Sequence, residues 1–125
     1  MSNLKHFEEY EFKMGAENVF DRMSAWFLIN LDQLRENCGF PLIISSSFRT
    51  TQHHGKIYQK LCKPAPMKSM HLKGRAVDIK TEHLTGDQRV KLMQEALALG
   101  FSVGAYKTIF HIDDRRNQTI FGNSM

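Results

Sequence analysis

Apolar side chains between residues 16 and 37 recur at intervals close to 3.6 residues, which predicts an amphipathic helix. Thr85 and Gln88 form the pattern of a capping box, so a second helix is predicted over 85–99. A third, shorter helix is predicted over 50–61. We expect the apolar stripe of the first helix to pack in the core: Val19, Phe20, Met23, Trp26, Phe27, Leu31 and Leu34.

Four short apolar segments are typical of strands, over 41–48, 76–80, 101–106 and 108–113. Residues 104–107, where the last two of these segments meet, suit a hairpin turn. Helices and strands then alternate along the chain and end in two consecutive strands. This order predicts an α+β fold, with a small, mainly antiparallel sheet flanked by helices. We expect residues 1–125 to form one domain.

Composition and charge narrow the range of partners. The 125 residues are 42% hydrophobic and 24% charged, which is typical of a globular protein and excludes a disordered chain. The net charge is +4, which favours an acidic partner: nucleic acid, an anionic wall polymer or a membrane surface. Lysine and arginine form no block of five or more, so we expect no nucleic-acid partner.

No apolar run reaches the roughly 18 residues of a membrane span, so we expect no membrane insertion. The first residues have no apolar signal core, so we expect the protein to accumulate in the cytoplasm. Cys38 and Cys62 have no metal-binding spacing. We expect both to be free thiols that are buried or nearly so.

Two strands place polar side chains on one face of the predicted sheet. Side chains alternate along a strand, so Asp78 lies opposite its apolar neighbours, and His111 shares a face with Asp113. Gly74 permits a tight loop that brings His71 back towards Asp78. Two histidines and one aspartate are a donor set typical of catalytic zinc. By spacing alone, the favoured interpretation is that His71 and Asp78 are simply hydrogen-bonded without a metal.

Three motifs together resemble the zinc D-alanyl-D-alanine carboxypeptidase family, which shares its fold with the hedgehog signalling domain. The resemblance implies that His71, Asp78 and His111 are zinc ligands. It also implies peptidase activity on peptidoglycan and a hedgehog/DD-peptidase-like fold. The motifs are Ser45-Ser46-Ser47-Phe48-Arg49-Thr50, Ser69-x-His71-x-x-Gly74-Arg75-Ala76-x-Asp78-Ile79 and Ile109-Phe110-His111-Ile112-Asp113.

The same resemblance implies that Arg49 lies near the substrate carbonyl oxygen or carboxylate. A fixed guanidinium stabilises a developing oxyanion, and its planar fork suits a terminal carboxylate. We therefore predict catalytic and substrate-binding roles for Arg49. We also predict that Ser47, His54 and Tyr106 contribute to substrate binding.

The sequence departs from the family pattern at the general base. Members usually have an acid three residues before the last zinc histidine, and Thr108 occupies that position here. Asp113 is the predicted substitute as catalytic base. Two alternatives stay open for Asp113: it orients a zinc histidine, or it pairs with Arg115 or Arg116.

These features predict a monomeric zinc metallopeptidase that hydrolyses amide bonds in peptidoglycan stem peptides near a D-alanine. A basic protein of 14.5 kDa suits a phage lysis enzyme that reaches the cell wall through a separate pore. The alternative is an inert zinc-containing module of the same fold, which binds the wall or belongs to a virion.

Overall fold

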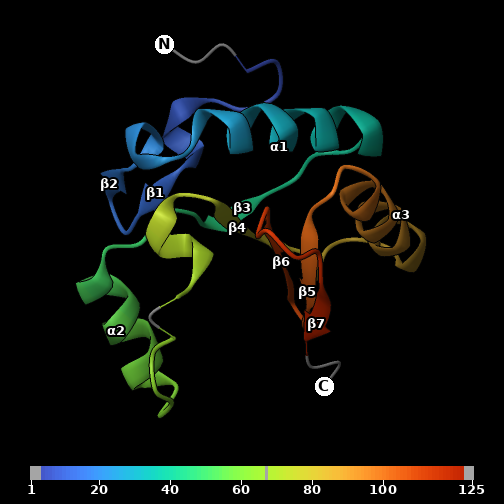
Figure 1. The fold of residues 1–125 in the computed structure, drawn as a ribbon. Helices are drawn as coiled ribbons and strands as arrows, with labels where there is room; N and C mark the ends of the chain where they lie inside the picture. Colours follow the sequence, from blue (N-terminus) through green and yellow to red (C-terminus); the bar gives the residue numbers. More distant parts are fainter. Residues whose placement is uncertain (1–3, 67, 123–125) are drawn as a thin grey trace.

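A mixed five-stranded sheet is the centre of the computed structural model, which describes residues 4–66 and 68–122 (Figure 1). The strand order is β3-β4-β6-β5-β7, and every pairing is antiparallel except that of β5 with β7. The strands are β3 (Ile44–Ser46), β4 (Ala76–Lys80), β5 (Ser102–Ala105), β6 (Ile109–Asp113) and β7 (Ile120–Gly122).

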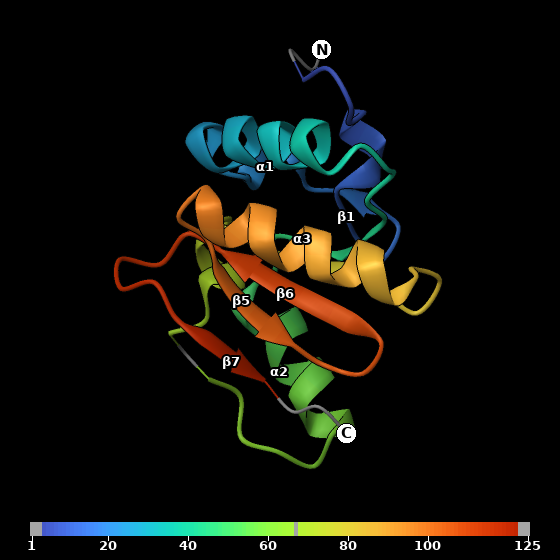
Figure 2. The same ribbon diagram turned by 90° about the vertical axis from the view of Figure 1, so that its right-hand side faces the viewer.

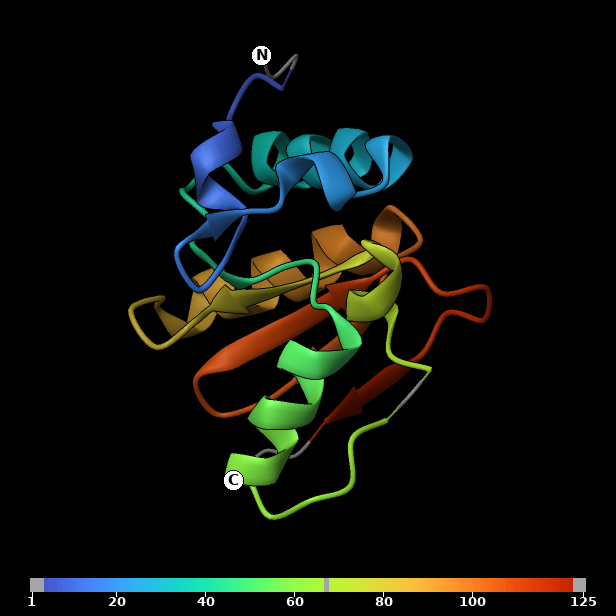
Figure 3. The same ribbon diagram turned by 90° about the vertical axis from the view of Figure 1, so that its left-hand side faces the viewer.

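Helices cover both faces of this sheet. Helices α1 (Ala25–Cys38) and α3 (Gly86–Ala98) lie on one side, and α2 (Thr51–Lys60) lies on the other (Figures 2 and 3). Three short 3₁₀ helices, η1 (Glu9–Glu11), η2 (Phe20–Arg22) and η3 (Met70–Lys73), and a hairpin of β1 (Lys13–Met14) and β2 (Glu17–Asn18) complete the described chain. The α+β prediction is confirmed. No helix in the described ranges has the length and hydropathy needed to cross a bilayer.

Two helices begin where their capping residues predict. Thr85 accepts a hydrogen bond from the backbone of Gln88, and the Gln88 side chain accepts one from the backbone of Thr85. Thr50 caps α2 in the same way by accepting from the His53 backbone. Each cap satisfies backbone N–H groups that the helix itself leaves unpaired, so local sequence determines where the helix starts.

The start of the first helix was predicted wrongly. Helix α1 begins at Ala25, after the N-cap Ser24, and not near residue 16. Val19 and Met23 are buried, but they reach the core from irregular chain and not from a helix. Trp26, which we expected in the core, is 70% exposed. Apolar periodicity alone cannot separate a helix from a preceding loop that buries residues at similar intervals.

The strand predictions hold for β4, β5 and β6 to within a residue or so. Strand β3 covers only three of the eight residues predicted for it, and β7 was not predicted. Cys38 is buried and free, as expected, and burial raises the pKa of its thiol to about 11. Cys62 is also free but exposed, which corrects the expectation that both thiols would be buried.

Replacing Gly74 with alanine should destabilise the fold by about 3 kcal/mol, because two penalties combine. Gly74 has a φ of +69°, and a Cβ there would meet the backbone carbonyl oxygen of Arg22. Gly55→Ala is the matched control, since a Cβ at Gly55 has open space and favours the helix. Urea unfolding of both variants measures the effect, and equal stabilities would contradict it.

Candidate metal centre

Strand pairing brings Asp78 and His111 together. They are directly opposite each other in the β4–β6 register. Residues opposite each other in an antiparallel pair lie on the same face with Cβ atoms about 5 Å apart. Val77 and Ile112, the neighbouring pair in the same register, are buried in the hydrophobic core. The alternation thus directs the two polar side chains away from the core, as the sequence predicted.

His71 reaches the same point from the 3₁₀ helix η3. Its backbone N–H is bonded to the N-cap Ser69, and its carbonyl accepts from the Arg49 backbone at 3.0 Å. Its ring Nδ1 lies 2.7 Å from the carbonyl oxygen of Ser47. A carbonyl can only accept, so Nδ1 carries the proton and donates. Segment 47–49 therefore determines both the position and the tautomer of the His71 ring.

Three donor atoms converge at this point. His71 Nε2 lies 3.2 Å from Asp78 Oδ1, and His111 Nδ1 lies 3.0 Å from the same oxygen. One ligand atom from each residue can be chosen so that all three lie within 4.8 Å of one another. The separations suit a single small ion with nitrogen and oxygen ligands.

The donor groups at this point suit a cation. His71 uses Nδ1 as a donor, and His111 uses Nε2, which lies 2.6 Å from Asp113 Oδ2. In the neutral rings, the remaining nitrogens therefore direct lone pairs at the Asp78 carboxylate. Burial alone would raise the pKa of Asp78, but hydrogen bonds and positive charge from His111 and His71, when these rings are protonated, hold it well below its usual value, so the carboxylate is ionised. Two lone pairs and a buried carboxylate fit a divalent metal ion.

Arg49 approaches the far oxygen of the same carboxylate. Its Nη2 donates to Asp78 Oδ2 at 3.0 Å, and its Nε donates to the Ser46 hydroxyl at 2.9 Å. The guanidinium is nearly buried but still lines the cleft beside the metal centre. Arg49 thus both orients Asp78 and presents positive charge to anything bound in the cleft.

Ser47 and His54, which we predicted to bind substrate, are not among the described residues that line the cleft. Both are fully buried. Ser47 acts through its carbonyl on His71. His54 Nδ1 accepts from Arg49 Nη1 at 3.2 Å, and its Nε2 donates to the Pro66 carbonyl at 3.0 Å. Burial and the charge of Arg49 lower the pKa of His54, so the neutral ring positions Arg49.

Asp113 is fully buried behind His111, so it is not placed to act as the predicted catalytic base. Its Oδ2 accepts from His111 Nε2, and both of its oxygens accept from Arg115. Burial alone would raise the pKa of Asp113, but these partners hold it well below its usual value. The contacts match the two other roles considered for Asp113: it orients a ligand histidine and pairs with Arg115.

Comparison with known proteins identifies the family. The family model described as Peptidase M15 matches residues 6–113, most of the chain. The chain belongs to the M15 peptidases, the zinc D-Ala-D-Ala carboxypeptidase family. No curated protein matches it. The matched range contains all three residues of the candidate metal centre, and M15 peptidases depend on zinc.

The cleft of this M15 peptidase has a volume of about 830 Å³ and opens over the metal centre. Tyr106 and Thr108 line it from the β5–β6 turn, as does Phe121 from β7. Burial raises the pKa of Tyr106, so its hydroxyl stays protonated and can donate to a substrate. Phe121 lies over the His111 ring, with centroids 5.6 Å apart.

Several residues that line the cleft were missed by the sequence analysis, and two of them are aromatic. Tyr58 faces the cleft from α2, and Phe121 lies on the strand that was not predicted. Gly104 was the one feature of the sequence that indicated a close neighbour at this point, because a Cβ at Gly104 would meet the Phe121 ring. A glycine inside a strand often indicates such a close approach. The sequence did not indicate which side chain approaches.

Proposed function

We propose that this M15 peptidase, acting as a monomer, hydrolyses amide bonds of peptidoglycan stem peptides next to a D-alanine. It would act as a carboxypeptidase or endopeptidase. The observation that carries the proposal is the open cleft above His71, Asp78 and His111, with Arg49 beside them. This arrangement offers a place for a peptide carbonyl next to both a metal and a fixed guanidinium.

The chain's own residues supply binding and orientation. Zinc held by His71, Asp78 and His111 would polarise the carbonyl and lower the pKa of a bound water to about 7. Arg49 stabilises the negative charge that develops on the carbonyl oxygen, and Tyr106 donates a hydrogen bond to the substrate. Hydrolysis forms a C–O bond and breaks the C–N bond, and the leaving amine gains a proton.

The reaction can proceed although Thr108 stands where family members usually have the acid that serves as general base. Thr108 cannot accept a proton, and Asp113 is buried behind His111. Among the described residues that line the cleft, Asp78 is the one acid, and it pairs with Arg49. If bound zinc lowers the pKa of a water to about 7, that water would lose its proton to solvent at neutral pH without a protein base.

The lack of a free carboxylate among the described residues of the cleft wall favours a second candidate, an inert zinc-containing wall-binding or virion module. A cleft wall whose described residues include no free carboxylate is what a module that had lost catalysis would show. We prefer the enzyme because Arg49 and Tyr106 still line the cleft. The net charge of +4 supports a phage lysis enzyme that adsorbs to anionic wall polymers.

Zinc-loaded protein incubated with purified cell walls is expected to release new amino groups, and EDTA should stop the release. Adding zinc back should restore it, because the protein ligands remain in place. Amine labelling and the masses of the products measure the reaction and identify the bond. Retained zinc without cleavage of any wall preparation would favour the inert module.

A further inference from the structure

Positive charge is concentrated in one stretch of this chain. Residues 37–77 contain seven lysines and arginines and no acid. The remaining residues carry ten lysines and arginines against all thirteen acids, so their net charge is negative. This stretch includes α2 and the loop that follows it, which lie over the sheet face that carries the metal centre (Figure 3).

Three lysines line the cleft without an acidic partner in the described structure. Lys63 and Lys68 come from the loop after α2, and Lys107 comes from the β5–β6 turn. All three are exposed, and the ion pairs found in the described ranges include none of them. The two arginines of the cleft, Arg49 and Arg115, are already paired with aspartates.

This distribution determines which peptides the cleft favours. An unpaired ammonium group at the cleft wall attracts a carboxylate and repels another ammonium group. Zinc bound by His71, Asp78 and His111 would add positive charge to the same space. A ligand with several free carboxylates therefore gains at each lysine, and a ligand with a basic side chain loses.

We propose that the cleft selects acidic peptides, and that among stem peptides it prefers diaminopimelate over lysine as the third residue. The proposal deepens the proposed function, on which the choice of stem peptides rests. Lysine and diaminopimelate differ by one side-chain carboxylate, so the two stems form a matched pair. Lys63, Lys68 and Lys107 are the residues that make the distinction.

The test compares two synthetic stem pentapeptides that differ only at the third residue. Zinc-loaded protein should show at least about fivefold higher kcat/KM for the diaminopimelate peptide in low salt, and salt should reduce the ratio. Lys63→Gln with Lys68→Gln should remove most of the preference. If neither peptide is cleaved, the same protein is titrated with each, and the ratio of Kd values replaces the ratio of rates.

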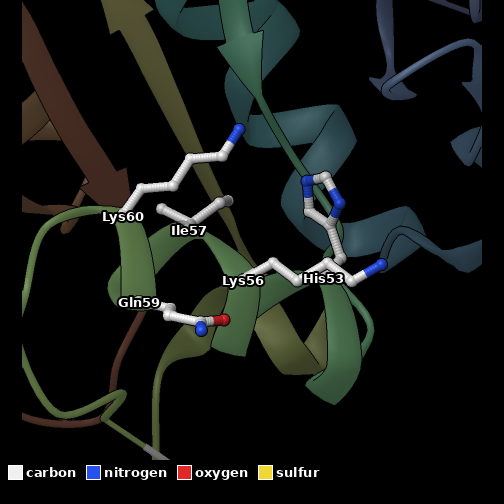
Figure 4. A pocket seen from close by; sticks show the side chains of 5 residues that line it. All are labelled: His53, Lys56, Ile57, Gln59 and Lys60. Carbon is white, nitrogen blue, oxygen red and sulfur yellow. The ribbon is translucent and has the colours of Figure 1, made fainter.

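Lys56→Gln is the matched control, paired with Lys60→Gln to change the charge equally. These lysines do not line the cleft but a neighbouring hollow of about 550 Å³ formed by α2 residues, which shares Ile57 with the cleft (Figure 4). The preference should survive in this variant. Equal values for both peptides, or equal losses in both double variants, would overturn the inference. Tighter binding of a single-stranded oligonucleotide than of the diaminopimelate peptide would also overturn it.

The outcomes separate this inference from the proposed function. Cleavage of both peptides at equal rates would leave the peptidase and remove the selectivity. A binding preference without cleavage would leave the acidic-peptide site and remove the peptidase.

Discussion

Replacing Asp78 with asparagine is expected to remove both zinc binding and hydrolysis. Asp78 is the only charged member of the three donors, and its other oxygen accepts from Arg49. The amide lacks the negative charge that balances the metal and the Arg49 guanidinium. The loss of zinc affinity should exceed the roughly 10–100-fold that removal of an outer partner causes.

Zinc titration followed by metal analysis measures this effect, and wall digestion measures the activity. Asp114→Asn is the matched control, because Asp114 pairs with Arg75 and does not line the cleft. It should keep full zinc occupancy. An Asp78→Asn variant that binds zinc as tightly as the unmodified protein would show that these three residues are not the metal site.

Replacing Asp113 with asparagine should weaken zinc binding by about 10–100-fold while leaving catalysis largely intact once zinc is saturating. Asp113 accepts from His111 Nε2 and also from Arg115. The asparagine amide has only one acceptor oxygen, so it cannot accept hydrogen bonds from His111 and Arg115 as the two carboxylate oxygens do. The His111 ring therefore loses part of its orientation. Rates should return to within about tenfold of the unmodified protein as zinc is raised.

Zinc-dependent rates at fixed substrate separate the two roles of Asp113. A general base would show the opposite pattern, with full zinc occupancy and turnover that no zinc concentration restores. Thermal unfolding of the variant should be recorded beside the assay. Asp113 is fully buried, so part of any loss could come from the fold.

The predictable parts of the fold are those that depend on neighbours in sequence. Capping residues determine where α2 and α3 begin, since Thr50 and Thr85 bond to backbone groups three residues away. The alternation of side chains along a strand predicted that Asp78 and His111 would face away from the hydrophobic core. The predicted start of α1 was wrong because Val19 and Met23 are also buried, although they lie in irregular chain before the helix.

The roles of the polar residues depended on distant contacts. We predicted from the sequence that His54 binds substrate, but its two ring nitrogens form hydrogen bonds with Arg49 and with the carbonyl of Pro66, which is 12 residues away. For Asp113 the sequence predicted a catalytic base and left two alternatives open, an orienting group and an ion-pair partner. Burial and the positions of His111 and Arg115 favour the second and third roles.

By itself the sequence determined the fold class, the family resemblance and the three candidate metal ligands, because residue type and strand period carry that information. Tertiary structure alone decided which nitrogen of each histidine faces Asp78, which polar groups are buried and which lysines share the cleft. Those outcomes depend on hydrogen-bond partners and packing between segments far apart in the chain. No local pattern of residues encodes them.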